Sequence, residues 1–239
     1  MKNIQYFEQI LKIPVEGTED QRKIILQKQE SVCFLLSLTL ENRNDDDLRR
    51  RIISSGIVEQ FLFIFTTKKL DQITRAYTEA FFHLTNNTSN EIKLLIFSKK
   101  PFPGLQRLLD HTEYLIVSDA IATFINILYA GANSTPETGP NPHFETVKSC
   151  WGIEKIFDLF QKTTNQYQKN RATLCIGLIF RAREISDLTM RKEIINHLKT
   201  LITDTDTWVK STAKYCLTGL SHNAVNKAEI ETGGFVIPK

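Results

Sequence analysis

Apolar residues recur three and four positions apart along most of this chain, and alternating runs of strand length are almost absent. This spacing predicts helices that each present one apolar face to a core. Five of the predicted helices share one layout when they are aligned on a small residue. The aligned residues are Ser31, Ala76, Ala120, Ala172 and Ala213. We expect each small residue to lie where another helix approaches closely.

The apolar positions of these helices follow the small residue at constant offsets. The residue four positions later is Leu35, Ala80, Phe124, Ile176 or Leu217. Three or four positions further on stand Leu38, Leu84, Ile127 with Leu128, Ile179 and Leu220. These positions predict one buried face on every helix.

A second ladder of positions supports a repeat. Gly56, Gly104 and Gly152 each precede a short amphipathic segment, and they are 48 residues apart. A period of about 40 to 48 residues, with two or three helices in each unit, is typical of helical repeat arrays. In the first full unit the expected helices cover residues 45–55, 57–67 and 71–87. The predicted fold is therefore all-α, a right-handed α-solenoid of about five repeats that forms a single domain over residues 1–239.

One insertion interrupts the period. Residues 131–145 contain three prolines and two glycines, so we expect an exposed loop without regular structure. Such loops lie on one face of a repeat array and sometimes bind partners, but we favour a tolerated surface insertion.

Two polar runs are expected at helix starts. Asp45, Asp46 and Asp47 suit the positive end of a helix, and three arginines that begin at Arg49 follow along the same helix. This run is either a partner patch or, as we favour, a solvated helix whose charges match the helix dipole. Asp206 is expected to be the N-cap of the last long helix.

Composition argues against several classes of protein. Thirty basic and 27 acidic residues give a net charge of +3, too balanced for a dedicated nucleic-acid binder. The four cysteines lie far apart and predict reduced, mostly buried thiols. The first residues do not form a signal peptide, and we expect no apolar run of the ~18 residues that a membrane span needs. A cytoplasmic location, with the nucleus possible, follows as an expectation.

The segment from Ala213 to Val236 resembles an armadillo repeat, with a long helix, an asparagine turn, "NK", a short helix and Gly-Gly before an apolar run. The segment around "SLTLENRNDDDLRRRIISSGIV" is similar. The resemblance extends from about Ser31 to Val236, and HEAT repeats are the nearest alternative. It implies that the third helices line a concave groove that binds an extended peptide.

The resemblance also implies a tryptophan two positions and an asparagine six positions after the small residue, as in nuclear-import adaptors. Only Asn126 matches, and Tyr215 is a loose substitute for the tryptophan. This departure argues against recognition of import signals. Trp151 and Trp208 fall elsewhere and are expected to be packing residues.

The candidate groove residues are polar positions on the same helical faces, and ordinary solvated residues are the alternative. Arginine and amide side chains suit the carbonyls and carboxylates of an extended segment. The candidates are Arg75, Asn86, Asp119, Asn126, Arg171, Arg181, Tyr215 and Asn223.

The sequence shows no motif of a hydrolase, a phosphate-binding loop or a dinucleotide fold, so we expect no enzyme, no cofactor and no metal site. Cys175 and Cys216 share one register position, which shared core packing explains better than a disulfide or a metal.

Two functions follow as hypotheses. The first is a scaffold or adaptor that binds an extended peptide or a helix in its groove. The second is a regulatory domain that grips a folded partner, a chaperone or a GTPase, through its convex face or its insertion loop. RNA binding is a weaker third possibility. Phe235, Val236 and Ile237 predict an apolar end that is either capped by the tails or covered by a partner, which includes another copy of the chain.

Overall fold

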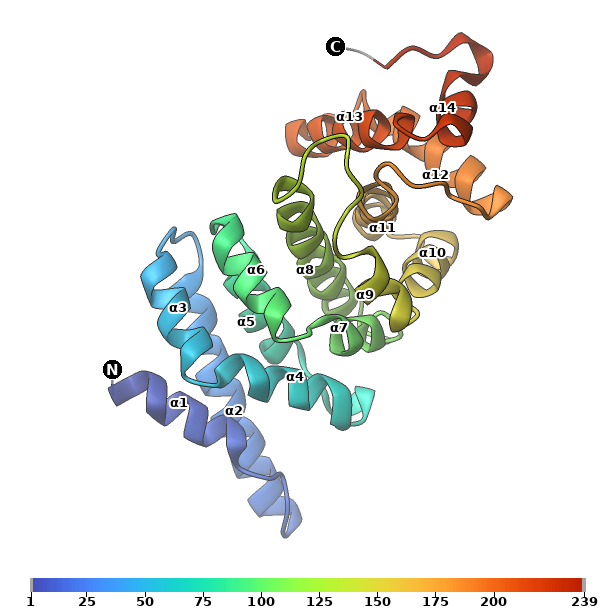
Figure 1. Ribbon diagram of the computed structural model, residues 1–239. Coiled ribbons are helices and arrows are strands. Elements are labelled where there is room, and N and C mark those ends of the chain that lie inside the picture. Colours follow the sequence, from blue (N-terminus) through green and yellow to red (C-terminus); the bar gives the residue numbers. More distant parts are fainter. Residues whose placement is uncertain (1, 238–239) are drawn as a thin grey trace. The chain divides into compact units, whose positions relative to one another are not determined.

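The computed structural model describes residues 2–237, and every regular element within them is helical (Figure 1). The chain forms two compact units, one that ends at Ile127 and one that begins at Leu128. Met1 and the last two residues of the predicted 1–239 domain lie outside the described part, and the prediction of a single domain stays a prediction.

The first unit stacks like helices on like helices. Its elements are α1 (Lys2–Lys12), α2 (Glu19–Leu40), α3 (Asp46–Ser54), α4 (Ile57–Thr67), η1 (Leu70–Gln72), α5 (Arg75–Thr85), α6 (Asn90–Ser98), α7 (Phe102–Leu108) and the larger part of α8 (Tyr114–Asn133). α2 packs on α5, α3 packs on α6, and α4 lies between α1 and α7. Aromatic side chains fill the core, where the rings of Phe61 and Phe65 each meet Phe81 edge-on.

The second unit contains α9 (Phe144–Ser149), α10 (Gly152–Lys162), α11 (Gln166–Ile179), α12 (Leu188–Leu201), α13 (Thr207–Ser221), α14 (Ala224–Glu231) and η2 (Thr232–Gly234). α11 packs on α10, α12 and α13, and α14 packs on α12 and α13. A single helix, α12, stands between α11 and α13. The expected separate first helix is therefore missing from this repeat in the described chain.

Helix starts follow the sequence closely. Asp45 caps α3 by accepting a hydrogen bond from the Leu48 amide, and Asp206 caps α13 by accepting from Trp208 and Val209. A cap of this kind satisfies backbone donors that have no partner inside the helix. Both predictions about acidic caps are confirmed.

The glycine ladder is wrong in register. The turn before each second helix needs a residue with positive φ, and Gly56, Lys100 and Trp151 occupy it, with φ of 93°, 58° and 60°. Gly104 and Gly152 lie inside helices instead. A Cβ at Gly104 would stand 3.0 Å from the Cβ of Phe65, so its role is close packing and not a turn.

The expected buried face of α2 is also wrong by one position. Leu35 and Leu38 are 47% and 52% exposed, whereas Val32 and Leu36 are buried. The stretch is apolar on both sides, so the helical period alone did not decide which side packs. On the other four helices Ala120, Ala172 and Ala213 are buried as expected, and Ala76 is half-buried.

The insertion is shorter and better anchored than predicted. Residues 134–143 lie outside helices, while residues at both ends of the 131–145 range continue α8 and α9. Asn141 is buried and donates hydrogen bonds of 3.1 Å to the carbonyls of Leu128 and Leu178. His143 is buried as well. The exposed part is therefore limited to about residues 133–140.

The expectation of no membrane span stays a prediction, although one helix of the described chain passes a test of length and composition. The helix Tyr114–Asn133 is long and apolar enough by composition, but 78% of its most apolar window is buried inside the structure. A mostly buried helix of this length is what the core of a packed protein contains, so it is weak evidence for a span.

Candidate functional site

A groove in the first unit exposes apolar side chains of α2 next to α5. Phe34, Leu35 and Leu38 are 57%, 47% and 52% exposed, and they lie on one side of α2. A hollow of 920 Å³ extends from this side to the start of α5. We call it the α2–α5 groove, and its lining residues are Gln27, Glu30, Ser31, Phe34, Leu35, Thr74, Arg75, Ala76 and Glu113.

Two of the predicted residues meet in this unit. Arg75 pairs with Glu79 at 2.9 Å, and its Nε lies 3.9 Å from the carboxylate of Asp119. Asp119 is nearly buried and accepts a hydrogen bond of 2.8 Å from the Thr78 hydroxyl. Burial raises the pKa of Asp119 to about 6, although Thr78 and Arg75 oppose the rise. Arg75 is thus balanced by carboxylates of its own chain.

The three predicted asparagines have local roles. Asn223 caps α14 by accepting from the amides of Val225 and Asn226. Asn126 donates to the Thr85 hydroxyl at 3.2 Å, and the carbonyl of Asn86 accepts from Arg49 at 3.0 Å. Since Asn126 and Asn86 are half-buried, their remaining polar atoms can still reach solvent.

Arg181 is buried, which its placement among the groove candidates did not anticipate. Its guanidinium donates to the Ala132 carbonyl, to the Thr135 hydroxyl, to the Pro140 carbonyl at 3.3 Å and to the Tyr215 hydroxyl at 3.1 Å. It therefore holds the insertion loop and the end of α8, where the helix dipole favours a cation. Tyr215 is drawn into the same network and stays half-buried.

Arg49 has the equivalent role in the first unit, which corrects its expected solvation. It is fully buried and donates to the carbonyls of Leu40, His83 and Asn86 at 3.0 to 3.3 Å. These carbonyls end α2 and α5 and have no partner within their helices. Arg50 and Arg51 are solvent-accessible, in line with the prediction.

Arg171 lies on the surface of the second unit, close to two aromatic rings. Its guanidinium carbon is 4.6 Å from the centre of the Tyr167 ring and 4.2 Å from that of Trp208. Tyr167 and Trp208 are 43% and 39% exposed. We call these three residues the Arg171 clamp. Trp208 is thus not the packing residue that the sequence suggested, and Trp151, 70% exposed, is not one either.

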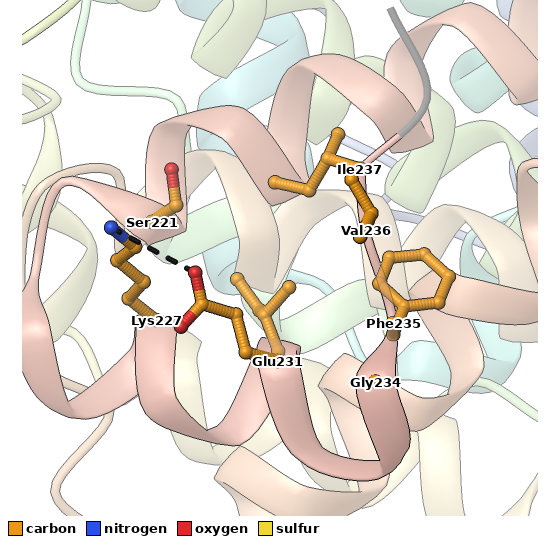
Figure 2. A pocket seen from close by; sticks show the side chains of 8 residues that line it. Ser221, Lys227, Glu231, Gly234, Phe235, Val236 and Ile237 are labelled. Carbon is orange, nitrogen blue, oxygen red and sulfur yellow. Dashed lines mark ion pairs between the residues drawn. The ribbon is translucent and has the colours of Figure 1, made fainter.

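A small hollow lies beside the end of the described chain. Figure 2 shows Phe235, Val236 and Ile237 on one side of it, and Lys227 and Glu231, which pair at 3.7 Å, on the other. Its volume is 420 Å³, and Val236 is 80% exposed. Association of copies through this end stays a prediction.

Reactive groups are few in the described chain. All four cysteines are free, and Cys33, Cys175 and Cys216 are buried, which raises the pKa of each thiol. A raised pKa leaves the thiol protonated and a poor nucleophile. No group of three or more metal-ligating side chains is found among residues 2–237.

Comparison with solved structures shows the fold. A designed armadillo repeat protein in complex with the peptide (KR)4 aligns with a TM-score of 0.66 and 15% identity, over 97% of this chain and 87% of that one. A computationally designed armadillo repeat protein for modular peptide recognition gives 0.64 and 16%, over 97% and 88%. The armadillo-repeats-only protein of Plasmodium falciparum gives 0.60 and 13%, over 92% of each chain. No protein-family model and no curated protein matches the chain.

The chain therefore has the armadillo-repeat fold, an all-helical α-solenoid, as its periodicity predicted. Sequence reasoning missed Phe34 and Trp208. Phe34 could have been detected from the sequence, because it directly precedes Leu35 and Leu36 and makes α2 apolar on more than one side. Trp208 lies 37 positions from Arg171, and only the fold brings the two residues together.

Proposed function

We propose that this chain is a non-enzymatic adaptor that binds a segment of another protein, an extended peptide or a helix, along its third helices. These are the helices that carry the aligned small residues, namely α2, α5, α8, α11 and α13. The observation that supports the proposal is the exposed apolar side of α2. Three large apolar side chains stand in one row beside a groove, and in the described chain none of them is more than about half covered. Contiguous exposed apolar surface of this kind is typical of interaction sites.

The α2–α5 groove suits a segment that offers apolar side chains together with hydrogen-bond donors or cations. Glu30 and Glu113 line it, and Arg75 is already balanced by Glu79 and Asp119. Apolar contact would provide the affinity, and the carboxylates at the edge would select the register of the bound segment.

The alternative, a grip through another face, makes a different prediction about α4. Phe63 on α4 is 62% exposed and belongs to the stack of α1, α4 and α7, not to that of α2 and α5. It offers a matched control, because replacing it removes a similar exposed apolar area from the same unit. The cytoplasmic location stays a prediction.

The test compares two variants. One is a double variant that carries both Phe34→Ser and Leu38→Ser, and the other is the single variant Phe63→Ser. Proteins retained by the immobilised wild-type chain from cell extract are identified by mass spectrometry, and each variant is then compared for the same partner. We expect the double variant to lose the partner and Phe63→Ser to retain it. The free energy of unfolding of both variants should lie within about 0.5 kcal/mol of wild type, because substitutions at exposed positions usually change stability little. Loss with Phe63→Ser alone would refute the groove in favour of the other face.

A further inference from the structure

The Arg171 clamp combines the three residue types that dominate binding energy at protein interfaces, namely tryptophan, tyrosine and arginine. All three come from the third helices of the second unit: Tyr167 and Arg171 from α11, and Trp208 from the first turn of α13. α11 and α13 pack directly on each other, so the arrangement belongs to the rigid part of the unit.

Both rings lie close to the guanidinium carbon, which stands over each of them. A guanidinium carries five N–H donors, and aromatic rings offer them no acceptor oxygen, so contact with the rings does not satisfy these donors. Within residues 2–237, the side chain of Arg171 takes part in no hydrogen bond and no ion pair, and the residue is half-buried. This contrasts with Arg49 and Arg181, whose donors are directed at carbonyls of their own chain.

The surrounding charge favours an anion. The sequences of α11 and α13 contain four basic residues, Lys169, Arg171, Lys210 and Lys214, and no aspartate or glutamate. The nearest acidic residues in the sequence, Asp204 and Asp206, precede α13, where Asp206 caps the helix and Asp204 accepts from the Asp206 amide. The carboxylates of both residues therefore already accept hydrogen bonds from backbone amides.

We infer that the Arg171 clamp is a binding site for a carboxylate of an acidic protein segment. The rings restrict the arginine before binding, so little side-chain entropy is lost when it forms a two-pronged pair with the carboxylate. The inference rests on the proposed role as an interaction scaffold, but it concerns a second surface with the opposite chemistry to the α2–α5 groove.

A protein carboxylate is favoured over a nucleic acid by the charge of the whole chain. The net charge is only +3, and α2 and α5 of the other unit together carry four acidic and four basic residues, so no excess of basic charge is found there. A single rigid guanidinium suits one carboxylate, whereas a polyphosphate backbone is bound by many dispersed cations.

The test uses fluorescein-labelled peptides of twelve residues, one alternating glutamate with serine and one alternating glutamine with serine, with anisotropy read at 150 mM NaCl. We expect the glutamate peptide to bind and the glutamine peptide to bind at least about tenfold more weakly, since charge-assisted pairs are about twice as strong as neutral ones. Arg171→Gln should reduce binding of the glutamate peptide by a similar factor. Arg171→Lys should reduce it partly, because lysine keeps the charge and loses the planar fork.

Two further variants distinguish a clamp from simple attraction. Trp208→Ala leaves the charge unchanged and should weaken binding nearly as much as Arg171→Gln, while Lys210→Gln, one positive charge less on α13, should change it less than about threefold. Circular dichroism of each variant confirms folding. Equal binding of the two peptides, or an equal loss with Lys210→Gln, would overturn the inference. Tighter binding of a twelve-nucleotide oligothymidylate that Arg171→Gln abolishes would reassign the site to nucleic acid.

Failure of the Arg171 clamp can be distinguished from failure of the α2–α5 groove. Phe34→Ser with Leu38→Ser should leave the affinity for the glutamate peptide unchanged, because these residues belong to the other unit. Failure of the clamp with a working α2–α5 groove would refute this inference alone.

Discussion

The third helices of the two units differ in the chemistry that they expose. α2 and α5 present an apolar row and carry charges of both signs, four acidic and four basic residues. α11 and α13 present aromatic rings around Arg171 and carry no acidic residue. Helices at the same place in a repeat therefore need not recognise the same partner chemistry.

The two units are alike where the chain is buried. Each buries one arginine, Arg49 or Arg181, against carbonyls that end a third helix. The packing positions that define the fold are thus constrained, while the outward positions of each helix are free to differ. The fold by itself does not identify a function, so the proposed binding role depends on the outward side chains.

The largest expected effect on stability tests whether the two buried arginines have the same role. Replacing Arg49 or Arg181 with methionine should each lower the free energy of unfolding by about 3 kcal/mol or more, because several buried carbonyls lose their donors. The measurement is urea unfolding followed by circular dichroism.

Arg51→Met is the matched control, since Arg51 is exposed on the same helix as Arg49 and should change stability by less than about 0.5 kcal/mol. A small effect for Arg181→Met together with a large one for Arg49→Met would mean that the two units use their buried arginines differently.

The second prediction uses groups whose pKa values move in opposite directions. Burial raises the pKa of Asp119, in the first unit, to about 6, and lowers that of His143, in the second, to about 4. Asp119 takes up its proton in the folded state first, so its contribution to stability grows as pH falls from about 6. His143 takes up its proton in the unfolded state first, so its contribution is complete above about pH 6.5 and is lost as pH falls toward 4.

Between pH 6.5 and 4 the two contributions should largely cancel. Asp119→Asn leaves only the histidine and should make the protein lose up to about 3 kcal/mol more than wild type over this range, at 1.36 kcal/mol per pKa unit. His143→Gln leaves only the aspartate, so the free energy of unfolding should rise by a similar amount, relative to wild type, as pH falls over the same range. Urea unfolding at half-unit pH intervals measures both, and curves parallel to wild type would contradict the assigned shifts.

The helical fold could be predicted from the sequence because its signals are local. Apolar periodicity and capping carboxylates act within one or two turns, so α3 and α13 begin where Asp45 and Asp206 indicated. The register of α2 could not be decided, because Phe34, Leu35 and Leu36 are consecutive and apolar. Only the neighbouring helices determine which of them is covered.

The candidate site was less predictable because its residues meet across long separations. Arg181 and Arg171 look alike in the sequence, yet one is surrounded by the insertion loop and the other by two rings. The difference depends on Pro140 and Trp208, both more than 30 positions away. A list of polar positions on helical faces cannot distinguish a structural cation from one that is available for binding.

The smallest expected effect concerns the turn that precedes the second helix in each unit. Gly56 and Trp151 occupy the same turn with φ of 93° and 60°, a conformation that glycine adopts freely and tryptophan adopts at a cost of about 1 kcal/mol. Trp151→Gly should therefore raise the free energy of unfolding by up to about 1 kcal/mol. Gly56→Ala should lower it by about as much, because alanine adopts this positive φ at a similar cost, while its Cβ, 3.4 Å from Glu8, would add no crowding.

Thermal unfolding of the two variants separates backbone strain from side-chain packing. If Trp151→Gly destabilises the protein, the indole contributes to packing in spite of its exposure. If the variant is more stable, folding does not require the indole, since Trp151 is 70% exposed. Strain retained at an exposed aromatic residue is then a reason to look for its use in binding, because such strain concentrates at functional sites.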